Sequence, residues 1–310
     1  MELIFLGTGA SVPSESRNAS SMALIREGEI LLFDCGEGTQ LQMMKAHLGF
    51  RRKMKVFITH MHGDHTLGLL GLIQTMSLFG RESELQVYGP PTLSPFLAST
   101  LAYLRVRPRF PLRIGEVTPG IILEENKYIM KATRADHFGE SFSFGLIEKE
   151  RPGKFDAKKA RAIGIPEGPI RSLIQQGKTV TLKDGTAVSP GEILGPPRSG
   201  RKIVYSGDTR SCDEIVKLAK GADLLIHEAT FDDSLAEEAS EMGHSTSTQA
   251  AEIARKAGVR KLILTHISAR YQDPQLLLSQ AKAIFPDVEV AEDLQRLMIP
   301  LRRSSEAVQT

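Results

Sequence analysis

The sequence predicts an α/β protein. Apolar runs rich in β-branched residues recur along the chain, and each is short enough for a buried strand. Stretches with helical periodicity separate several of these runs, which is typical of a sheet covered by helices. A chain of 310 residues can bury a large core, either as one layered domain or as two smaller ones.

The predicted strands are the apolar runs themselves. In chain order they are ELIFL (2–6), MALI (22–25), EILLFD (29–34), KVFITH (55–60), YIMKAT (128–133), SFSFGLI (141–147), RKIVYSGD (201–208), ADLLIHE (222–228), KLILTHI (261–267) and RLMIPL (296–301). The early runs follow one another closely enough for hairpins. Helices are expected between the other runs, at 38–47, 66–79, 92–104, 211–219, 247–257 and 274–284.

One segment, 149–180, breaks this pattern with Pro and Gly punctuation, short helical pieces and few large apolar residues. Residues 149–171 contain seven basic and three acidic residues, a local net charge of +4. The segment is therefore interpreted as an insertion. It is either a solvated surface excursion or a protruding, flexible arm that binds a polyanion.

Bulk composition limits the class of protein. The net charge of +2 excludes a surface that is cationic overall, so any site for a polyanion must be local. No apolar run approaches the roughly 20 residues of a membrane-spanning helix, and Glu2 and Gly7 interrupt any secretory signal. Cys35 and Cys212 are too few for a disulfide framework. These features predict a cytoplasmic protein without membrane contact.

The motif THMHGDH (59–65) follows an apolar run directly. His60 and His62 are two residues apart, and extended backbone turns both imidazoles to one side. Gly63 allows a sharp turn that brings Asp64 and His65 toward a second nearby point. Imidazole and carboxylate are ligands of zinc and similar ions in hydrolases, so the spacing predicts two metal positions.

Further candidate ligands lie at the ends of other predicted strands. They are His137, Asp208 and His266, with His227 and His244 nearby and only His47 placed in an ordinary helix. Strand ends are where α/β sheets build sites. Asp208 alone is weak evidence for a metal site, because aspartate is common in turns. Together with the other candidate ligands, Asp208 is the natural ligand to bridge two ions about 3.5 to 4 Å apart.

These residues carry a resemblance to a known group of proteins. HMHGDH with His137, Asp208 and His266 resembles the metallo-β-lactamase superfamily. Within it, the chain resembles the ribonuclease Z family from FLGTGASVPS to THISARY, with LIHEAT, GHST and HISARY as supporting motifs. The resemblance implies one αββα four-layer sandwich over residues 1–310, with two divalent metal ions at one edge.

The same resemblance suggests contacts with substrate. GIPEGP is similar to the Gly-Pro element of the family's exosite, which implies roles for Gly168 and Pro169. PSESRN (13–18) resembles the family's PxKxRN loop, and Arg17 and Asn18 match it, whereas Glu15 replaces the lysine. Arg270 could meet a substrate phosphate bidentately, or it could be an ordinary surface arginine.

The expected chemistry is hydrolysis of a phosphodiester, in which two ions lower the pKa of a water and offset developing charge. By resemblance Asp64 is the proton acceptor; the alternative is metal ligation only. Glu228 with His244 is similar to the family's acid for the leaving oxygen, and the alternative is a hydrogen-bonded pair behind the metal ligands. The ligand types accept several metals, with zinc expected.

Three functions are compatible with the sequence. The first is an endoribonuclease that removes the 3′ trailer from precursor transfer RNA and leaves a 3′-hydroxyl, working as a homodimer whose arm grips the RNA. The second is a small-molecule hydrolase, namely a lactonase, thioesterase or phosphodiesterase, with the insertion as a lid. The third is a non-catalytic RNA-binding scaffold. Because every ligand position is filled, the sequence favours an enzyme, and the basic insertion favours RNA.

Overall fold

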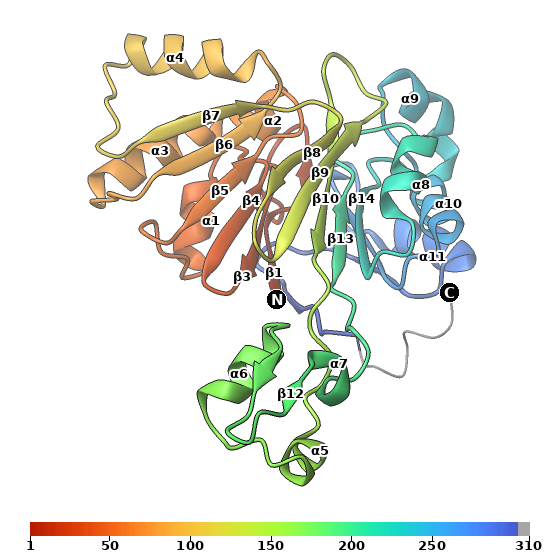
Figure 1. The fold of residues 1–310 in the computed structure, drawn as a ribbon. Coiled ribbons are helices and arrows are strands. Elements are labelled where there is room, and N and C mark those ends of the chain that lie inside the picture. The colour runs from red at the N-terminus through yellow and green to blue at the C-terminus, as the bar shows by residue number, and fades with distance from the viewer. Residues whose placement is uncertain (303–310) are drawn as a thin grey trace. The chain divides into compact units, whose positions relative to one another are not determined.

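A computed structural model describes residues 1–302 of the chain (Figure 1). Two compact units make up the chain. The first, here called the core unit, comprises Met1–Glu124, Ile129–Leu146 and Lys202–Pro300. The second, here called the insert unit, comprises Glu125–Tyr128 and Ile147–Arg201. None of the helices within residues 1–302 is both long and apolar enough to cross a bilayer.

The first sheet of the core unit has seven strands. Their order is β18 (Arg296–Met298), β1 (Glu2–Gly7), β3 (Ser21–Arg26), β4 (Glu29–Phe33), β5 (Met54–Phe57), β6 (Leu85–Gly89) and β7 (Leu112–Glu116). Strands β18, β1, β3 and β4 pair antiparallel, whereas β4 to β7 pair parallel. Every residue of β4 and β5 is buried, as expected for a parallel sheet covered on both faces.

The second sheet also has seven strands. Their order is β17 (Val288–Val290), β15 (Leu262–Thr265), β14 (Leu224–Glu228), β13 (Lys202–Tyr205), β10 (Phe142–Glu148), β9 (Tyr128–Arg134) and β8 (Gly120–Glu124). Strands β13, β14, β15 and β17 run parallel to one another. Their carboxyl ends therefore lie at one edge of this sheet.

Helices cover the outer face of each sheet, which gives four layers (Figure 1). Helices α1 (Thr39–Lys45), α3 (Gly68–Leu78) and α4 (Leu93–Tyr103) pack on the first sheet, and α8 (Asp213–Ala219), α10 (Ser247–Ala257) and α11 (Gln275–Ile284) on the second. Between the sheets, Phe33 lies 5.4 Å from Phe57, 6.2 Å from Phe144 and 6.1 Å from Tyr205, measured between ring centroids. The expected αββα sandwich is confirmed.

Short elements complete the core unit. They are β2 (Gly9–Ala10), α2 (Gly63–Thr66), β16 (Ile267–Ser268), the 3-10 turn η1 (Asp233–Leu235) and α9 (Ala236–Glu241). Strands β2 and β16 pair with each other. This pairing fastens the start of the chain to the segment that follows β15.

Some sequence expectations were wrong in detail. The predicted helix 66–79 is two helices, α2 and α3, which meet at Leu67. The predicted helix 38–47 ends at Lys45, and His47 lies beyond it with a φ of 57°. Strands β6, β7, β8 and β17 were not predicted. In β6, β7 and β17 charged or polar residues interrupt the apolar ones, and the apolar run of β8 is only three residues long.

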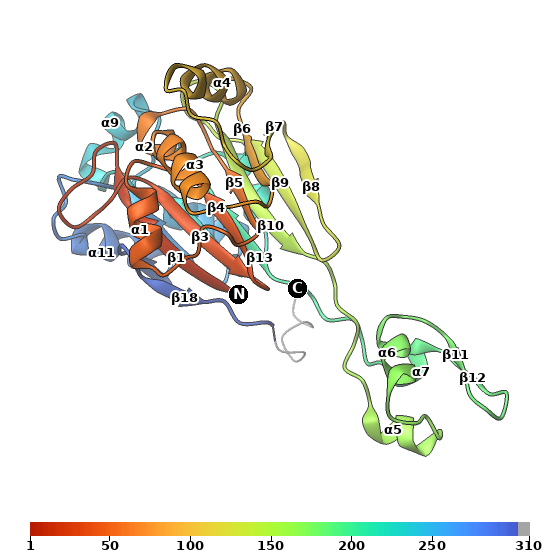
Figure 2. The same cartoon turned by 90° about the vertical axis from the view of Figure 1, so that its left-hand side faces the viewer.

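The insert unit contains helices α5 (Ala157–Ala162), α6 (Pro169–Gln175) and α7 (Pro190–Ile193) and the hairpin β11 (Val180–Thr181) with β12 (Ala187–Val188) (Figure 2). A small apolar cluster holds these elements together, formed by Ala160, Ile165, Ile174, Val180, Val188 and Ile193. The unit extends to Arg201, whereas the sequence suggested an end near residue 180.

Candidate metal centre

The predicted ligands come together at one edge of the core unit because most of them follow strands. His60 and His62 come after β5, His137 after β9, Asp208 after β13 and His266 after β15. The carboxyl ends of parallel strands share an edge, which brings residues some two hundred positions apart into one site. His266 has a φ of 56°, a conformation that residues other than glycine rarely adopt.

Asp64 and His65 reach the site from α2. At Gly63 the backbone changes directly from extended at His62 to helical, because Gly63 is the first residue of this helix. One helical turn then carries Asp64 and His65 to a point beside the imidazoles of the preceding strand end. Because the helix begins directly after His62, one short segment supplies ligands to both groups described below.

Two groups of potential metal ligands that share no residue form here, each with ligand atoms within 4.8 Å of one another, and a third group, Asp208 with His244 and His266, overlaps both. The first contains His60, His62, His137 and Asp208, and the second contains Asp64, His65 and His266. One oxygen of Asp208, Oδ2, lies 3.3 Å from Nε2 of both His65 and His266 and 3.6 Å from Nε2 of His60. Asp208 therefore adjoins both groups, as a bridging carboxylate would.

Hydrogen bonds to Nδ1 fix the orientation of four of the histidine rings. The partner atoms are Thr59 Oγ1 for His60 at 2.9 Å, Asp34 Oδ2 for His65 at 2.8 Å, the Gly243 carbonyl for His137 at 2.7 Å and Thr230 Oγ1 for His266 at 2.9 Å. With Nδ1 as donor, each Nε2 has a free lone pair directed into the site. This pattern is typical of metal-binding histidines.

The donor set fits divalent cations. His137 Nε2 lies 3.2 Å from His62 Nδ1, and His65 Nε2 lies 3.3 Å from His266 Nε2. Nitrogens about 2.0–2.1 Å from a tetrahedral zinc are separated by about 3.3–3.4 Å. Within residues 1–302, the buried atoms His60 Nε2 and Asp208 Oδ1 have no hydrogen-bond partner, which a cation would supply.

The electrostatics of the site point the same way. Burial disfavours a charged Asp208, but the charges of His266 and His65 outweigh it and hold its pKa well below the usual value. Burial and the charge of His65 lower the pKa of His60, so that ring is neutral. For His65, burial is outweighed by Asp208, Asp34 and Asp64, which raise its pKa. The excess of negative charge is what divalent cations would neutralise.

Asp34 is a site residue that the sequence analysis missed. It follows β4, is fully buried, and has a φ of 55°. Besides His65, its carboxylate accepts hydrogen bonds from the Thr59 amide at 2.8 Å and the Tyr205 hydroxyl at 2.9 Å. It therefore orients both the loop of His60 and the ring of His65. The available signal was an aspartate closing the apolar run EILLFD, the same arrangement that identified Asp208.

Glu228 and His244 form the predicted pair beside the metal ligands. Glu228 is 1% exposed, and its Oε1 lies 2.8 Å from His244 Nδ1 and accepts from the Thr209 amide at 2.8 Å. Burial alone would lower the pKa of His244, but the charge of Glu228 outweighs it and raises this pKa to about 9. His227 is buried behind the site, with Nδ1 bonded to the Glu228 carbonyl at 2.7 Å.

The loop before β3 contacts the site through Ser11, whose backbone amide donates to Asp64 Oδ2 at 2.8 Å. Asn18 donates from Nδ2 to the Glu37 carbonyl at 2.8 Å. Arg17, expected to contact substrate, is 8% exposed, and its guanidinium donates to Thr8 Oγ1 and to the Ala291 carbonyl, both at 2.7 Å. These contacts give Arg17 a part in fixing the loop.

Arg270 lies at the rim of the site, and its side chain is 45% exposed. Its guanidinium stands 5.1 Å from the centre of the Phe231 ring and pairs with Glu238 at 3.1 Å. Arg270 is therefore a partly exposed cation with one acidic partner.

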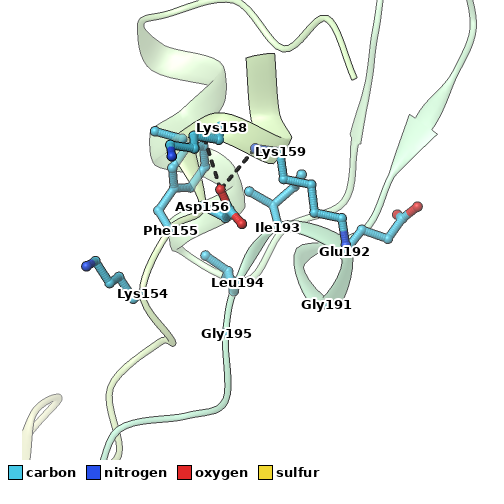
Figure 3. Close-up of a pocket in the computed structure, with 11 residues that line it drawn as sticks. Lys154, Phe155, Asp156, Lys158, Lys159, Gly191, Glu192, Ile193, Leu194 and Gly195 are labelled. Carbon is cyan, nitrogen blue, oxygen red and sulfur yellow. Dashed lines mark hydrogen bonds between the residues drawn. The ribbon is translucent and has the colours of Figure 1, made fainter. Parts of the chain in front are cut away.

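The insert unit carries the other two residues suggested as substrate contacts. Pro169 is the first residue of α6, and Gly168 precedes it with a φ of 122° and open space around its Cα. In the same unit, Lys154, Lys158 and Lys159 line a cavity of about 590 Å³ with the apolar Phe155 and Ile193 (Figure 3). Asp156 caps α5 by accepting from the amides of Lys158 and Lys159. The cavity combines cations with apolar surface.

Comparison with known proteins adds independent information. Residues 1–105 match the family described as Anti-Pycsar protein Apyc1, and residues 171–267 match the Beta-lactamase superfamily domain. The chain is 46% identical to Ribonuclease Z of Methanosarcina acetivorans over 97% of this chain and 99% of that protein. It is 44% identical to Ribonuclease Z of Geobacillus kaustophilus over 97% of this chain and 99% of that protein.

Solved structures agree. The short form of human tRNase Z superposes with a TM-score of 0.72 at 33% identity, over 97% of this chain and all of that one. The metallo-beta-lactamase fold protein YhfI from Bacillus subtilis gives a TM-score of 0.68 at 18% identity, over 96% of this chain and 99% of that one, a likeness of fold alone. The fold expected from the sequence is thereby confirmed.

Proposed function

The chain belongs to the ribonuclease Z family, and from this premise we propose that it is an endoribonuclease that removes the 3′ trailer from precursor transfer RNA by phosphodiester hydrolysis, leaving a 3′-hydroxyl. One observation carries the proposal: six family-type ligands and a central carboxylate converge at one edge of a full-length ribonuclease Z fold. The small-molecule hydrolase is not favoured, since the relatives at 43–46% identity are named ribonuclease Z.

We assign the ligands of two divalent ions, with zinc as the proposed metal, to the two groups described above. They are His60, His62, His137 and Asp208 for one ion and Asp64, His65, His266 and Asp208 for the other. Bound ions supply a hydroxide nucleophile at neutral pH and offset the charge that develops on the phosphate. The imidazole nitrogens of five histidines favour zinc over harder ions, which prefer oxygen ligands.

Asp64 serves this site as an oriented anion. Burial would raise its pKa, but the charge of His65 and the hydrogen bond with His266 hold it far below the usual value. A carboxylate with so low a pKa is a weak proton acceptor. The Ser11 amide also engages Oδ2. These features support the role of ligand over that of general base.

His244 is our candidate for the acid that protonates the leaving 3′ oxygen. The Glu228 carboxylate fixes its Nδ1, so Nε2 is the nitrogen free to face the substrate. The raised pKa of about 9 keeps the imidazole protonated at neutral pH. Glu228 itself accepts from the Thr230 hydroxyl at 2.8 Å and the Ser245 amide at 3.1 Å, so it is held as an anion and acts through His244.

We propose that Asn18 and Arg270 contact the RNA near the cut and that the insert unit, with Gly168 and Pro169, grips its folded body. The net charge of residues 147–201 is +5, and three lysines line the cavity of Figure 3, which supports binding of phosphates. A homodimer and a cytoplasmic location follow from the family resemblance. The exposed Leu41 and Met44, one turn apart on α1, offer apolar surface for a second copy.

The decisive experiment uses end-labelled precursor transfer RNA. Purified protein should cut it on the 3′ side of the discriminator nucleotide and leave a 3′-hydroxyl. Asp64→Ala and His244→Ala should lose at least about 100-fold in rate, whereas His47→Asn, a histidine change outside the site, should keep the wild-type rate. Faster turnover of a lactone, thioester or small phosphodiester than of the RNA would overturn the assignment.

A further inference from the structure

Two arginine–phenylalanine pairs lie at the rim of the metal centre, and they are built in opposite ways. In the first, Phe231 is 3% exposed, and Arg270, 5.1 Å from the ring centre, has a side chain that is 45% exposed. The buried Phe231 ring supports the guanidinium from below, and the guanidinium is the group that faces solvent. Such a pair presents a cation.

In the second pair the exposed partner is the ring. Phe138 is 52% exposed, and the Arg210 guanidinium lies 5.5 Å from its centroid. Arg210 donates from Nε to the Ser240 carbonyl and from NH1 to Asp136 Oδ1 at 3.1 Å. Its side chain is 29% exposed. Here the anchored guanidinium supports one side of the ring, and the remaining aromatic surface is presented to solvent.

Phe138 is held against the metal centre. It follows His137 directly, and the two ring centroids are 5.4 Å apart. Gly243 fixes both residues: its carbonyl binds His137 Nδ1 at 2.7 Å, and a Cβ at this position would stand 3.3 Å from Phe138 Cε2. Gly243 has a φ of 78°, so the backbone can pass this close only because it lacks a side chain.

We propose that Phe138 is a stacking platform for an unpaired nucleobase beside the scissile phosphate. The inference rests on the proposed function and deepens it by assigning a base-binding position. An aromatic face binds any base by stacking, which suits a substrate whose trailer varies in sequence. A protein partner is disfavoured, because the Phe138 ring lies between the Arg210 guanidinium and the polar metal centre, whereas protein interfaces use broad apolar patches.

The first test compares aromatic with non-aromatic side chains at this position. Phe138→Leu and Phe138→Ala should raise KM for precursor transfer RNA roughly tenfold and leave kcat within about twofold, whereas Phe138→Trp should keep the wild-type KM. Bound metal, measured by mass spectrometry, should be the same in all variants. The matched control is Phe79→Ala, because Phe79 is 53% exposed and follows the far end of α3, about 16 Å along the helix from the site loop.

The second test removes the base from the substrate. Two substrates are made, each with an abasic nucleotide on a different side of the scissile phosphate. With one of the two, wild type and Phe138→Leu should have equal KM. A 2-aminopurine at that position should lose fluorescence on binding to wild type and keep it with Phe138→Leu. Two results would overturn the stacking role of Phe138 and leave the proposed function standing. One is that wild type cuts the precursor with the same KM as Phe138→Leu. The other is that the KM difference between them persists whichever side of the scissile phosphate carries the abasic nucleotide. Wild type that cuts no precursor overturns the proposed function as well.

Discussion

The core unit and the insert unit use polar residues in opposite ways. In the core unit, carboxylates and imidazoles are buried: Asp208 is 3% exposed, Glu228 1% and His65 fully buried. In the insert unit the lysines of the cavity are exposed, and the buried side chains are apolar except for Tyr128 and for Glu148, which pairs with Arg201. Residues 147–201 contain eleven basic and six acidic residues, a net charge of +5, whereas the rest of the chain has 28 basic and 31 acidic residues.

Under the proposed function, this difference would separate catalysis in the core unit from substrate recognition in the insert unit. A site for hydrolysis needs donors with fixed directions, and burial fixes them because each polar atom must find a partner. A surface that holds the phosphates of a folded RNA needs cations that water and substrate can reach. The comparison predicts that changes in the core unit abolish cleavage of every substrate, whereas changes in the insert unit affect the large substrate alone.

The largest expected effect comes from Asp208→Asn, which keeps the shape of the side chain and removes its charge. Because Asp208 Oδ2 adjoins ligands of both groups, we expect loss of metal and a fall of at least about 1,000-fold in cleavage of precursor transfer RNA and of a small phosphodiester alike. Metal content and both rates check it. Normal cleavage of the small substrate would contradict the role given to this residue.

Removal of the insert unit should give the next largest effect. Arg151 and Arg198 exchange two backbone hydrogen bonds of 2.9 Å, so residues 152–197 can be replaced by a short Gly-Ser turn between them. We expect kcat/KM for precursor transfer RNA to fall about 100-fold and hydrolysis of a small phosphodiester to persist. Equal loss of both activities would show that the two units do not divide the work as described.

A smaller effect should come from Glu228→Gln, which tests the acid. Protonated His244 is the active form, and its pKa of about 9 depends on the Glu228 carboxylate. Without that charge, burial lowers the pKa toward or below the ordinary imidazole value. Activity should therefore be lost at lower pH than in wild type, by about tenfold at pH 8. An unchanged alkaline limb of the pH–rate profile would exclude His244 as the acid.

The smallest expected effect is that of Glu15→Lys, which restores the lysine of the related loop. Glu15 is exposed, and the substitution exchanges a negative for a positive charge in the loop that contains Asn18, one of the proposed RNA contacts. We expect KM for precursor transfer RNA to fall about two- to fivefold and its salt dependence to steepen by about one phosphate contact. An unchanged KM and salt slope would mean that no phosphate reaches this position.

The sequence by itself determined the fold class and the ligand set. Apolar runs that need burial on both faces predict parallel strands, and the HxHxDH spacing with carboxylates and imidazoles at other strand ends predicts a dinuclear centre. Local spacing is enough for these conclusions because strand ends and short turns restrict where neighbouring side chains point. The same logic could have found Asp34, which closes a strand as Asp208 does.

Only the tertiary structure decided which side chains are buried and support their neighbours, and which are exposed to solvent. Arg17 and Arg270 look alike in sequence, yet Arg17 is buried and donates to the Thr8 hydroxyl and the Ala291 carbonyl, whereas Arg270 stands on a phenylalanine. Phe231 and Phe138 likewise differ only in what covers them. The apolar cluster of the insert unit also emerged only in three dimensions. Exposure and contact depend on residues distant in sequence, so no local pattern encodes them.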